Sequence, residues 1–198
     1  MRELLKSIED LKQSSVKNLV DKRIKEFQNL GKKSNNELFK ELCFCILTAN
    51  STAERCIDVQ NKIGNGFLTL SESRLQKELK KHGARFHTKR ANYIAEARKH
   101  KDKLKQQRDW LVENIKGIGY KEASHFLRNI GDKNTAIIDF HIIDILEKNK
   151  LIKRPKTLNK NSYIEIENKL KLLAKKLNLN LAELDLYLWY METGKILK

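Results

Sequence analysis

A single proline in 198 residues, combined with apolar residues that recur every three or four positions, most restricts the fold of this chain. Runs of alternating or β-branched residues that would indicate strands are nearly absent. Segments with helical spacing cover residues 4–11, 16–31, 38–46, 51–64, 71–82, 87–100, 110–116, 120–130, 139–146, 163–177 and 181–193. The sequence therefore predicts an all-α protein of about ten helices, and no repeat of about 20–50 residues indicates a solenoid.

Local signals predict several helix ends. The segment Ser51–Glu54 has capping-box spacing, so we expect Ser51 to begin a helix that ends at Gly64. Gly83 is expected to cap the end of the helix before it. Two lysine-rich stretches, residues 99–107 and 151–160, are expected to be solvated linkers.

The charge of the chain is strongly positive. Forty-one lysines and arginines against 25 acidic residues give a formal net charge of +16 and a pI near 9.7. Such an excess favours a polyanionic partner, with nucleic acid first. The alternative is a solvated lysine-rich surface of the kind that thermophilic proteins carry for stability.

The three cysteines, Cys43, Cys45 and Cys56, match no zinc or iron–sulfur spacing. We expect them to be small buried residues in a reducing compartment. The amphipathic start of the chain is unlike a signal peptide, and no apolar run approaches the ~18 residues of a membrane span. A cytoplasmic protein without membrane contact is therefore expected.

Residues 115–141 are the only stretch that indicates a chemistry. Gly117 and Gly119 lie between two helical patterns, and glycine allows positive φ and a close approach of the backbone to a ligand. Their amides would face outward at the start of the next helix, where anions are favoured, and would form a phosphate-binding turn. A helix C-cap followed by a new helix would give the same Gly-x-Gly pattern.

Lys121 follows this turn directly. A lysine amine in its neutral form can attack a sugar C1′ atom or form a Schiff base. The alternative is an ordinary surface lysine at the start of a helix.

Asp139 lies 18 residues after Lys121 and precedes Phe140 and His141. Its ordinary role would be the N-cap of the helix that follows, which would also fix its carboxylate in space. A fixed carboxylate near Lys121 could accept the lysine proton or stabilise positive charge on a deoxyribose. Capping and catalysis are compatible at this position.

The combined pattern resembles the helix-hairpin-helix DNA glycosylases that have a Gly-Pro-rich loop and a catalytic aspartate. Within them it is most similar to the second, mainly archaeal, subfamily of 8-oxoguanine DNA glycosylase/AP lyases. The matching segments are GIGYKEASHFLRN at residues 117–129 and IDFH at residues 138–141. The resemblance runs from about Leu38 to Lys198. It implies that Lys121 and Asp139 are catalytic and that Gly117 and Gly119 bind DNA phosphate.

The resemblance also implies a set of DNA contacts. Residues 47–55, with the sequence LTANSTAER, match a loop that enters the minor groove, where Asn50 would fill the space of the flipped nucleotide and Arg55 would touch the orphaned base. From the residues alone, a turn followed by an N-cap is the favoured interpretation of Asn50 and Ser51. The lesion pocket would hold Phe86, Trp189 and the terminal Lys198, with aromatic rings against the extruded base. A buried core tryptophan and a frayed tail are the alternatives.

Two departures from the family pattern refine the prediction. Lys116 stands where a proline commonly precedes Gly-x-Gly, and the four-cysteine cluster of the iron–sulfur members is absent.

The resemblance also implies two helical subdomains. One comprises residues 34–132, with the hairpin at about 109–130, and the other comprises residues 1–33 plus 133–198. The hairpin is expected at the cleft between them.

The predicted activity is a monomeric, bifunctional enzyme that removes 8-oxoguanine from double-stranded DNA and cleaves the abasic site by β-elimination. No metal or redox cofactor is expected, although the resemblance allows a monovalent cation at the hairpin. Two alternatives stay open: a glycosylase of the same fold for another damaged base, and a non-catalytic helix-hairpin-helix DNA-binding module.

Overall fold

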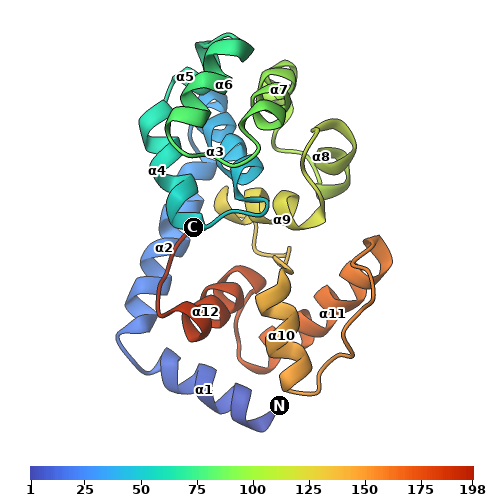
Figure 1. Cartoon of the computed structure of the whole chain (residues 1–198). Helices are drawn as coiled ribbons and strands as arrows, with labels where there is room; N and C mark the ends of the chain where they lie inside the picture. The colour runs from blue at the N-terminus through green and yellow to red at the C-terminus, as the bar shows by residue number, and fades with distance from the viewer. The chain divides into compact units, whose positions relative to one another are not determined.

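The computed structural model describes residues 1–198, and helix is its only regular secondary structure, as predicted (Figure 1). It contains twelve α-helices, one 3-10 helix and no strand. The chain forms two compact units. The first unit consists of residues 1–28 and 131–198, and the second consists of residues 29–130.

The second unit is built around a helix that is apolar on nearly every side. This helix, α3 (Asn35–Thr48), is buried at every residue from Glu41 to Thr48. A helix that is hydrophobic all round belongs in a core. The same core receives buried residues from α4 (Ala53–Ile63), α5 (Gly66–Thr69), α6 (Glu72–Lys81), α7 (His87–Ala97), α8 (Arg108–Asn114) and α9 (Tyr120–Asn129). The 3-10 helix η1 (Arg98–Lys103) contacts α3 and α7.

One buried charge ties α3 to α9 within this core. The Glu41 carboxylate accepts hydrogen bonds from Asn129 Nδ2 at 2.6 Å and from Gln60 Nε2 at 3.2 Å. A buried carboxylate is tolerated only when it is hydrogen-bonded in this way. The end of α9 is therefore held at a defined place on α3.

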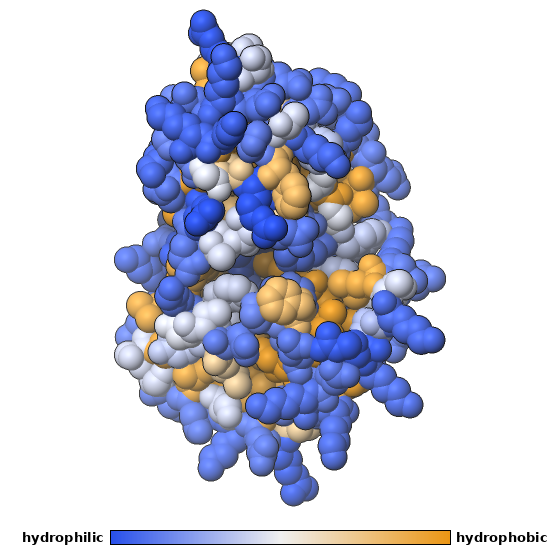
Figure 2. Space-filling view, in the orientation of Figure 1, coloured by the Kyte–Doolittle hydropathy of each residue, from blue (hydrophilic) through white to orange (hydrophobic).

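The first unit packs its helices around α12. Its helices are α1 (Arg2–Lys12), most of α2 (Val16–Gly31), α10 (Phe140–Lys148), α11 (Lys160–Lys176) and α12 (Leu181–Thr193). Helix α12 contacts α1, α10 and α11, and its Leu184, Leu186 and Leu188 are buried. Figure 2 shows hydrophilic residues over most of the visible surface of the second unit, and a mixture of hydrophilic and apolar residues on that of the first.

Several helix ends differ from the sequence prediction. Thr52, not Ser51, is the N-cap of α4, and no side-chain hydrogen bond caps that helix. The stretch 99–107 is only partly a solvated linker, because it contains most of η1 and the buried Leu104. His82 is the C-cap of α6, and Gly83 follows it with φ of +74°. No helix is long and apolar enough to cross a membrane.

Candidate active site

The turn between α8 and α9 depends on glycine at position 117. Gly117 has φ of +81°, and a Cβ atom there would lie 2.2 Å from Cδ2 of Tyr93. Either fact alone would disfavour any other residue. Ile118, the next residue, is buried in the core of the second unit. The turn is therefore anchored by an apolar side chain and shaped by a glycine.

Gly119 has neither the positive φ nor the outward-facing amide that was expected of it. Its φ is −99°, a value open to any residue, so only Gly117 supplies positive φ in this turn. The Gly119 N–H donates to Glu122 Oε2 at 3.2 Å. The amide that we expected to face outward for a phosphate is thus held by a carboxylate of the same helix, in the manner of half a capping box.

The two hairpin helices are joined by side chains as well as by the turn. The Tyr120 hydroxyl donates to Asp109, and Arg108 Nη1 donates to Ser124 Oγ at 3.2 Å. The Arg108 guanidinium also lies 5.0 Å from the centre of the Tyr120 ring. Because Tyr120 and Ser124 flank Lys121 on α9, these contacts fix the backbone that carries the lysine.

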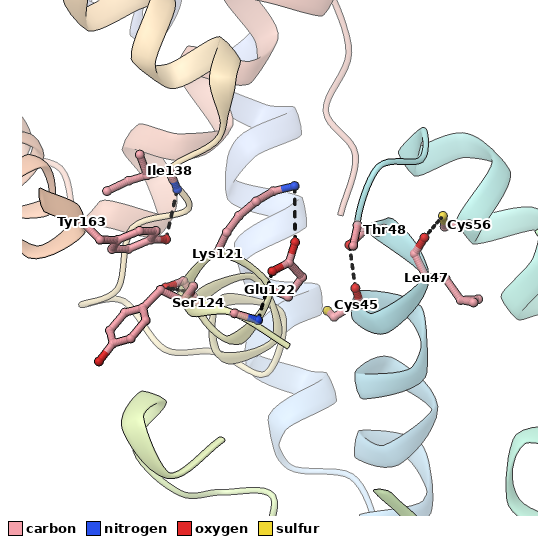
Figure 3. Close-up of polar contacts among 12 residues, drawn as sticks. Cys45, Leu47, Thr48, Cys56, Lys121, Glu122, Ser124, Ile138 and Tyr163 are labelled. Carbon is pink, nitrogen blue, oxygen red and sulfur yellow. Dashed lines mark hydrogen bonds and ion pairs between the residues drawn. The ribbon is translucent and has the colours of Figure 1, made fainter. Parts of the chain in front are cut away.

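Lys121 lies in the first turn of α9, and its side chain is 31% exposed. Its Nζ atom is 3.7 Å from Glu122 Oε1, so the same carboxylate contacts both the turn and the lysine (Figure 3). Sequence reasoning did not single out Glu122. Its position, three residues after a helix N-cap, is the signal that could have identified it.

Asp139 is the N-cap of α10, as predicted. Its carboxylate accepts a hydrogen bond from the Ile142 N–H at 3.0 Å. This bond satisfies one of the free amides of the helix start and sets the direction of the carboxylate. Asp139 belongs to the first unit and Lys121 to the second.

The loop that carries Asn50 is held by arginines of the same unit. Asn50 is exposed with φ of +54°, and its carbonyl accepts from Arg85 Nη1 at 2.8 Å. Arg90 donates to the neighbouring Ala49 carbonyl. Arg55, at the start of α4, donates to the Gly83 carbonyl at 3.4 Å. These bonds link the Asn50 loop to the segment before α7.

Phe86 lies in that segment. The residue is 54% exposed, its φ is +52°, and the guanidinium groups of Arg85 and Arg90 lie 5.4 Å and 5.6 Å from the centre of its ring. The structure therefore brings Asn50, Arg55 and Phe86 together in the second unit. Burial lowers the pKa of Arg90 and raises that of the Cys56 thiol nearby.

Trp189 and Lys198 lie in the first unit, at the end of α12 and at the C-terminus. Trp189 is half-buried and meets the His141 ring edge-to-face at a centroid distance of 5.5 Å. The tail is in contact with α2, because Arg23 Nη2 lies 3.4 Å from the Ile196 carbonyl oxygen. His125 packs edge-to-face against Phe44, with the ring centroids 5.5 Å apart.

Comparisons with known proteins agree over most of the chain. The family model for 8-oxoguanine DNA glycosylase matches residues 20–179. An 8-oxoguanine DNA glycosylase/AP lyase of Methanocaldococcus jannaschii is 54% identical, over 98% of this chain and 99% of the relative. The crystal structure of the M. jannaschii 8-oxoguanine glycosylase/lyase with a 15mer DNA containing 8-oxoguanine matches with a TM-score of 0.95 and 53% identity, over 99% of this chain and 100% of that one. The 8-oxoguanine DNA glycosylase of Thermotoga maritima matches with a TM-score of 0.94 and 41% identity, over 100% and 99% of the two chains.

Proposed function

The chain belongs to the 8-oxoguanine DNA glycosylase family, and we propose that it removes 8-oxoguanine from double-stranded DNA and then cleaves the strand at the abasic site. The observation that carries this proposal is Lys121, which lies in the first turn of α9, directly after the Gly117–Gly119 turn. Relatives that bear both activities in their name match this chain over nearly its full length.

The proposed chemistry begins at the lysine. The Lys121 amine attacks C1′ of the damaged nucleotide, the C1′–N9 bond breaks, and 8-oxoguanine leaves with its bonding electron pair. Asp139 accepts the proton that the amine loses, or stabilises the positive charge that develops on the sugar. The C1′–O4′ bond then breaks, O4′ takes up a proton, and C1′ forms an iminium with Lys121. Water accepts a C2′ proton, and β-elimination expels the 3′ phosphate, which stays on the downstream strand as its 5′ end.

The remaining parts of the proposal concern binding. DNA phosphate binds at the hairpin turn, where it replaces the Glu122 carboxylate on the Gly119 amide. Asn50 and Arg55 enter the minor groove, and Phe86, Trp189 and Lys198 receive the extruded base. The protein acts as a monomer in the cytoplasm. The lysine and the carboxylate supply the nucleophile and the base, so no metal or redox cofactor is part of this proposal.

A monovalent cation at the hairpin is tested by comparing DNA affinity in potassium and tetramethylammonium salts.

Borohydride trapping on a duplex that carries one 8-oxoguanine tests the central claim. Wild type is expected to form a covalent adduct, Lys121→Gln none, and Asp139→Asn at least about a hundredfold less in the same time. All three proteins should bind a duplex with an uncleavable abasic analogue with similar affinity at one fixed salt concentration. Tight binding with no adduct from wild type would leave only a binding module, or a glycosylase for another lesion that a panel of damaged bases would identify.

A further inference from the structure

The residues just before Asp139 lie outside any helix and yet are buried. Ala136, Ile137 and Ile138 are 3%, 8% and 0% exposed. The chain has no strand that could pair with them, so their backbone N–H and C=O groups need other partners. An unpaired buried amide would cost about as much as a lost hydrogen bond.

Two side chains of α11 supply these partners. Glu167 Oε1 accepts from the Ala136 N–H at 2.8 Å. The Tyr163 hydroxyl donates to the Ala136 carbonyl at 2.7 Å and accepts from the Ile138 N–H at 3.1 Å. The contact between Ile138 and Tyr163 is drawn in Figure 3. Tyr163 and Glu167 are four residues apart and thus share one face of α11.

Both side chains are themselves buried, at 1% and 2% exposed. A buried tyrosine hydroxyl and a buried carboxylate are costly unless they are hydrogen-bonded, and here they bond a segment that is 25 to 31 residues away in sequence. Apolar side chains could fill the same space, but they would leave the buried backbone groups of Ala136 and Ile138 without these partners. The polar pair therefore gives the segment a defined position rather than additional packing.

Asp139 is the next residue, and its own carboxylate is held by the Ile142 N–H. The aspartate is thus fixed on its C-terminal side by the helix it caps and on its N-terminal side by α11. We propose that Tyr163 and Glu167 are positioning residues that hold Asp139 in register for its part in base excision. This inference rests on the proposed function, because it assumes that Asp139 acts in the reaction.

The test uses full-length variants under single-turnover conditions, with enzyme in excess over a duplex that contains one 8-oxoguanine. Tyr163→Phe removes only the hydroxyl, and Glu167→Leu removes the carboxylate that accepts from Ala136 together with its ion pair to Lys171. Each is expected to lower the excision rate constant by about tenfold or more, since small misplacements of catalytic groups cost up to about a hundredfold. Affinity for the uncleavable abasic analogue should change by less than about threefold.

Glu167→Gln provides the matched control, because the amide oxygen still accepts from Ala136 while the ion pair with Lys171, at 3.6 Å, is lost. This variant should retain the wild-type rate constant within about threefold. Leu170→Ala, buried on the same helix, should lower the melting temperature while leaving the rate constant unchanged below melting.

The rate constant and the amplitude of excision together distinguish a positioning role from an effect on protein stability alone. A destabilised protein contains fewer active molecules, which lowers the amplitude of excision but not its rate constant. Wild-type rate constants in both Tyr163→Phe and Glu167→Leu, with only amplitude or melting temperature reduced, would overturn the positioning role. Failure of the proposed function is recognised separately, by the absence of a borohydride adduct from wild type.

Discussion

At the scale of single residues, the two glycines of the hairpin turn should tolerate substitution very differently. Gly117→Ala introduces a Cβ atom 2.2 Å from the Tyr93 ring at φ of +81°, so we expect it to destabilise the protein by more than ~2 kcal/mol and to weaken DNA binding strongly. Gly119→Ala places its Cβ 3.4 Å from the end of the flexible Glu122 side chain and should remain folded. Thermal unfolding of both variants gives the comparison.

The companion variant Gly117→Ala with Tyr93→Ala separates the two causes. If the ring clash dominates, removal of the ring restores most of the lost stability. If positive φ dominates, the double variant stays unstable. Equal stability of Gly117→Ala and wild type would contradict the geometry of the turn.

Tyr187 should make stability depend on alkaline pH. Burial first, then the nearby carboxylates of Asp21, Glu183 and Glu9, raise the pKa of Tyr187 from 10.0 to about 12. The unfolded chain loses this proton near pH 10 and the folded chain near pH 12. The stabilisation that protonated Tyr187 gives the folded state is therefore complete below pH 10 and is lost as pH rises from 10 to 12. Denaturant unfolding at pH 9 and pH 11.5 should show a smaller drop for Tyr187→Phe than for wild type, and an equal drop would argue against the shift.

The sequence predicts a residue's role best where that role depends only on neighbours a few positions away in the chain. Asp139 caps α10 because its carboxylate needs only the amide three residues on. Ser51 satisfies the same spacing rule, but the helix begins one residue later than the rule suggests. Gly119 was misassigned because Gly-x-Gly does not say which glycine takes positive φ.

At the scale of the elements, the Asn50 loop should depend on Arg85. Its guanidinium bonds the Asn50 carbonyl, and a charge-assisted hydrogen bond of this kind contributes about 1.5–3 kcal/mol, less where it is exposed as here. We expect Arg85→Ala to speed amide exchange in residues 49–52 with little change in the melting temperature. Hydrogen exchange read by mass spectrometry measures this.

Arg74→Ala is the control for that experiment, because Arg74 is an arginine on the neighbouring helix α6. It removes an equal charge but no bond to the loop. Faster exchange in both variants would point to the loss of charge, and unchanged exchange in Arg85→Ala would mean that the bond does not restrain the loop.

Elements were predictable where helical periodicity alone decides them. The helices of both units follow their apolar patterns, and α9 spans 120–129 against the expected 120–130. The short α5 and the 3-10 helix η1 were missed, since four to six residues carry too little periodicity. The bonds from Tyr163 and Glu167 to residues 136–138 were beyond reach, because no local rule connects positions so far apart.

At the scale of the whole molecule, the net charge of +16 bears on how tightly any DNA is held. Each phosphate that the protein neutralises releases a condensed counterion, so the logarithm of affinity falls linearly with the logarithm of salt. With about six phosphate contacts, affinity should fall about a thousandfold between 50 and 200 mM salt. Fluorescence anisotropy with an undamaged duplex measures the slope.

Comparison of Lys121→Gln with wild type distinguishes the electrostatic contribution to DNA binding from the chemistry of excision. Lys121→Gln is expected to keep the slope within about one unit, because one side chain accounts for at most one phosphate and Lys121 is assigned to the sugar. Excision should nevertheless vanish in that variant, so affinity and activity would be lost by different substitutions. A slope near zero would mean that the excess charge is a solvated surface, as lysine-rich thermophilic proteins carry, and that contacts other than phosphate hold the DNA.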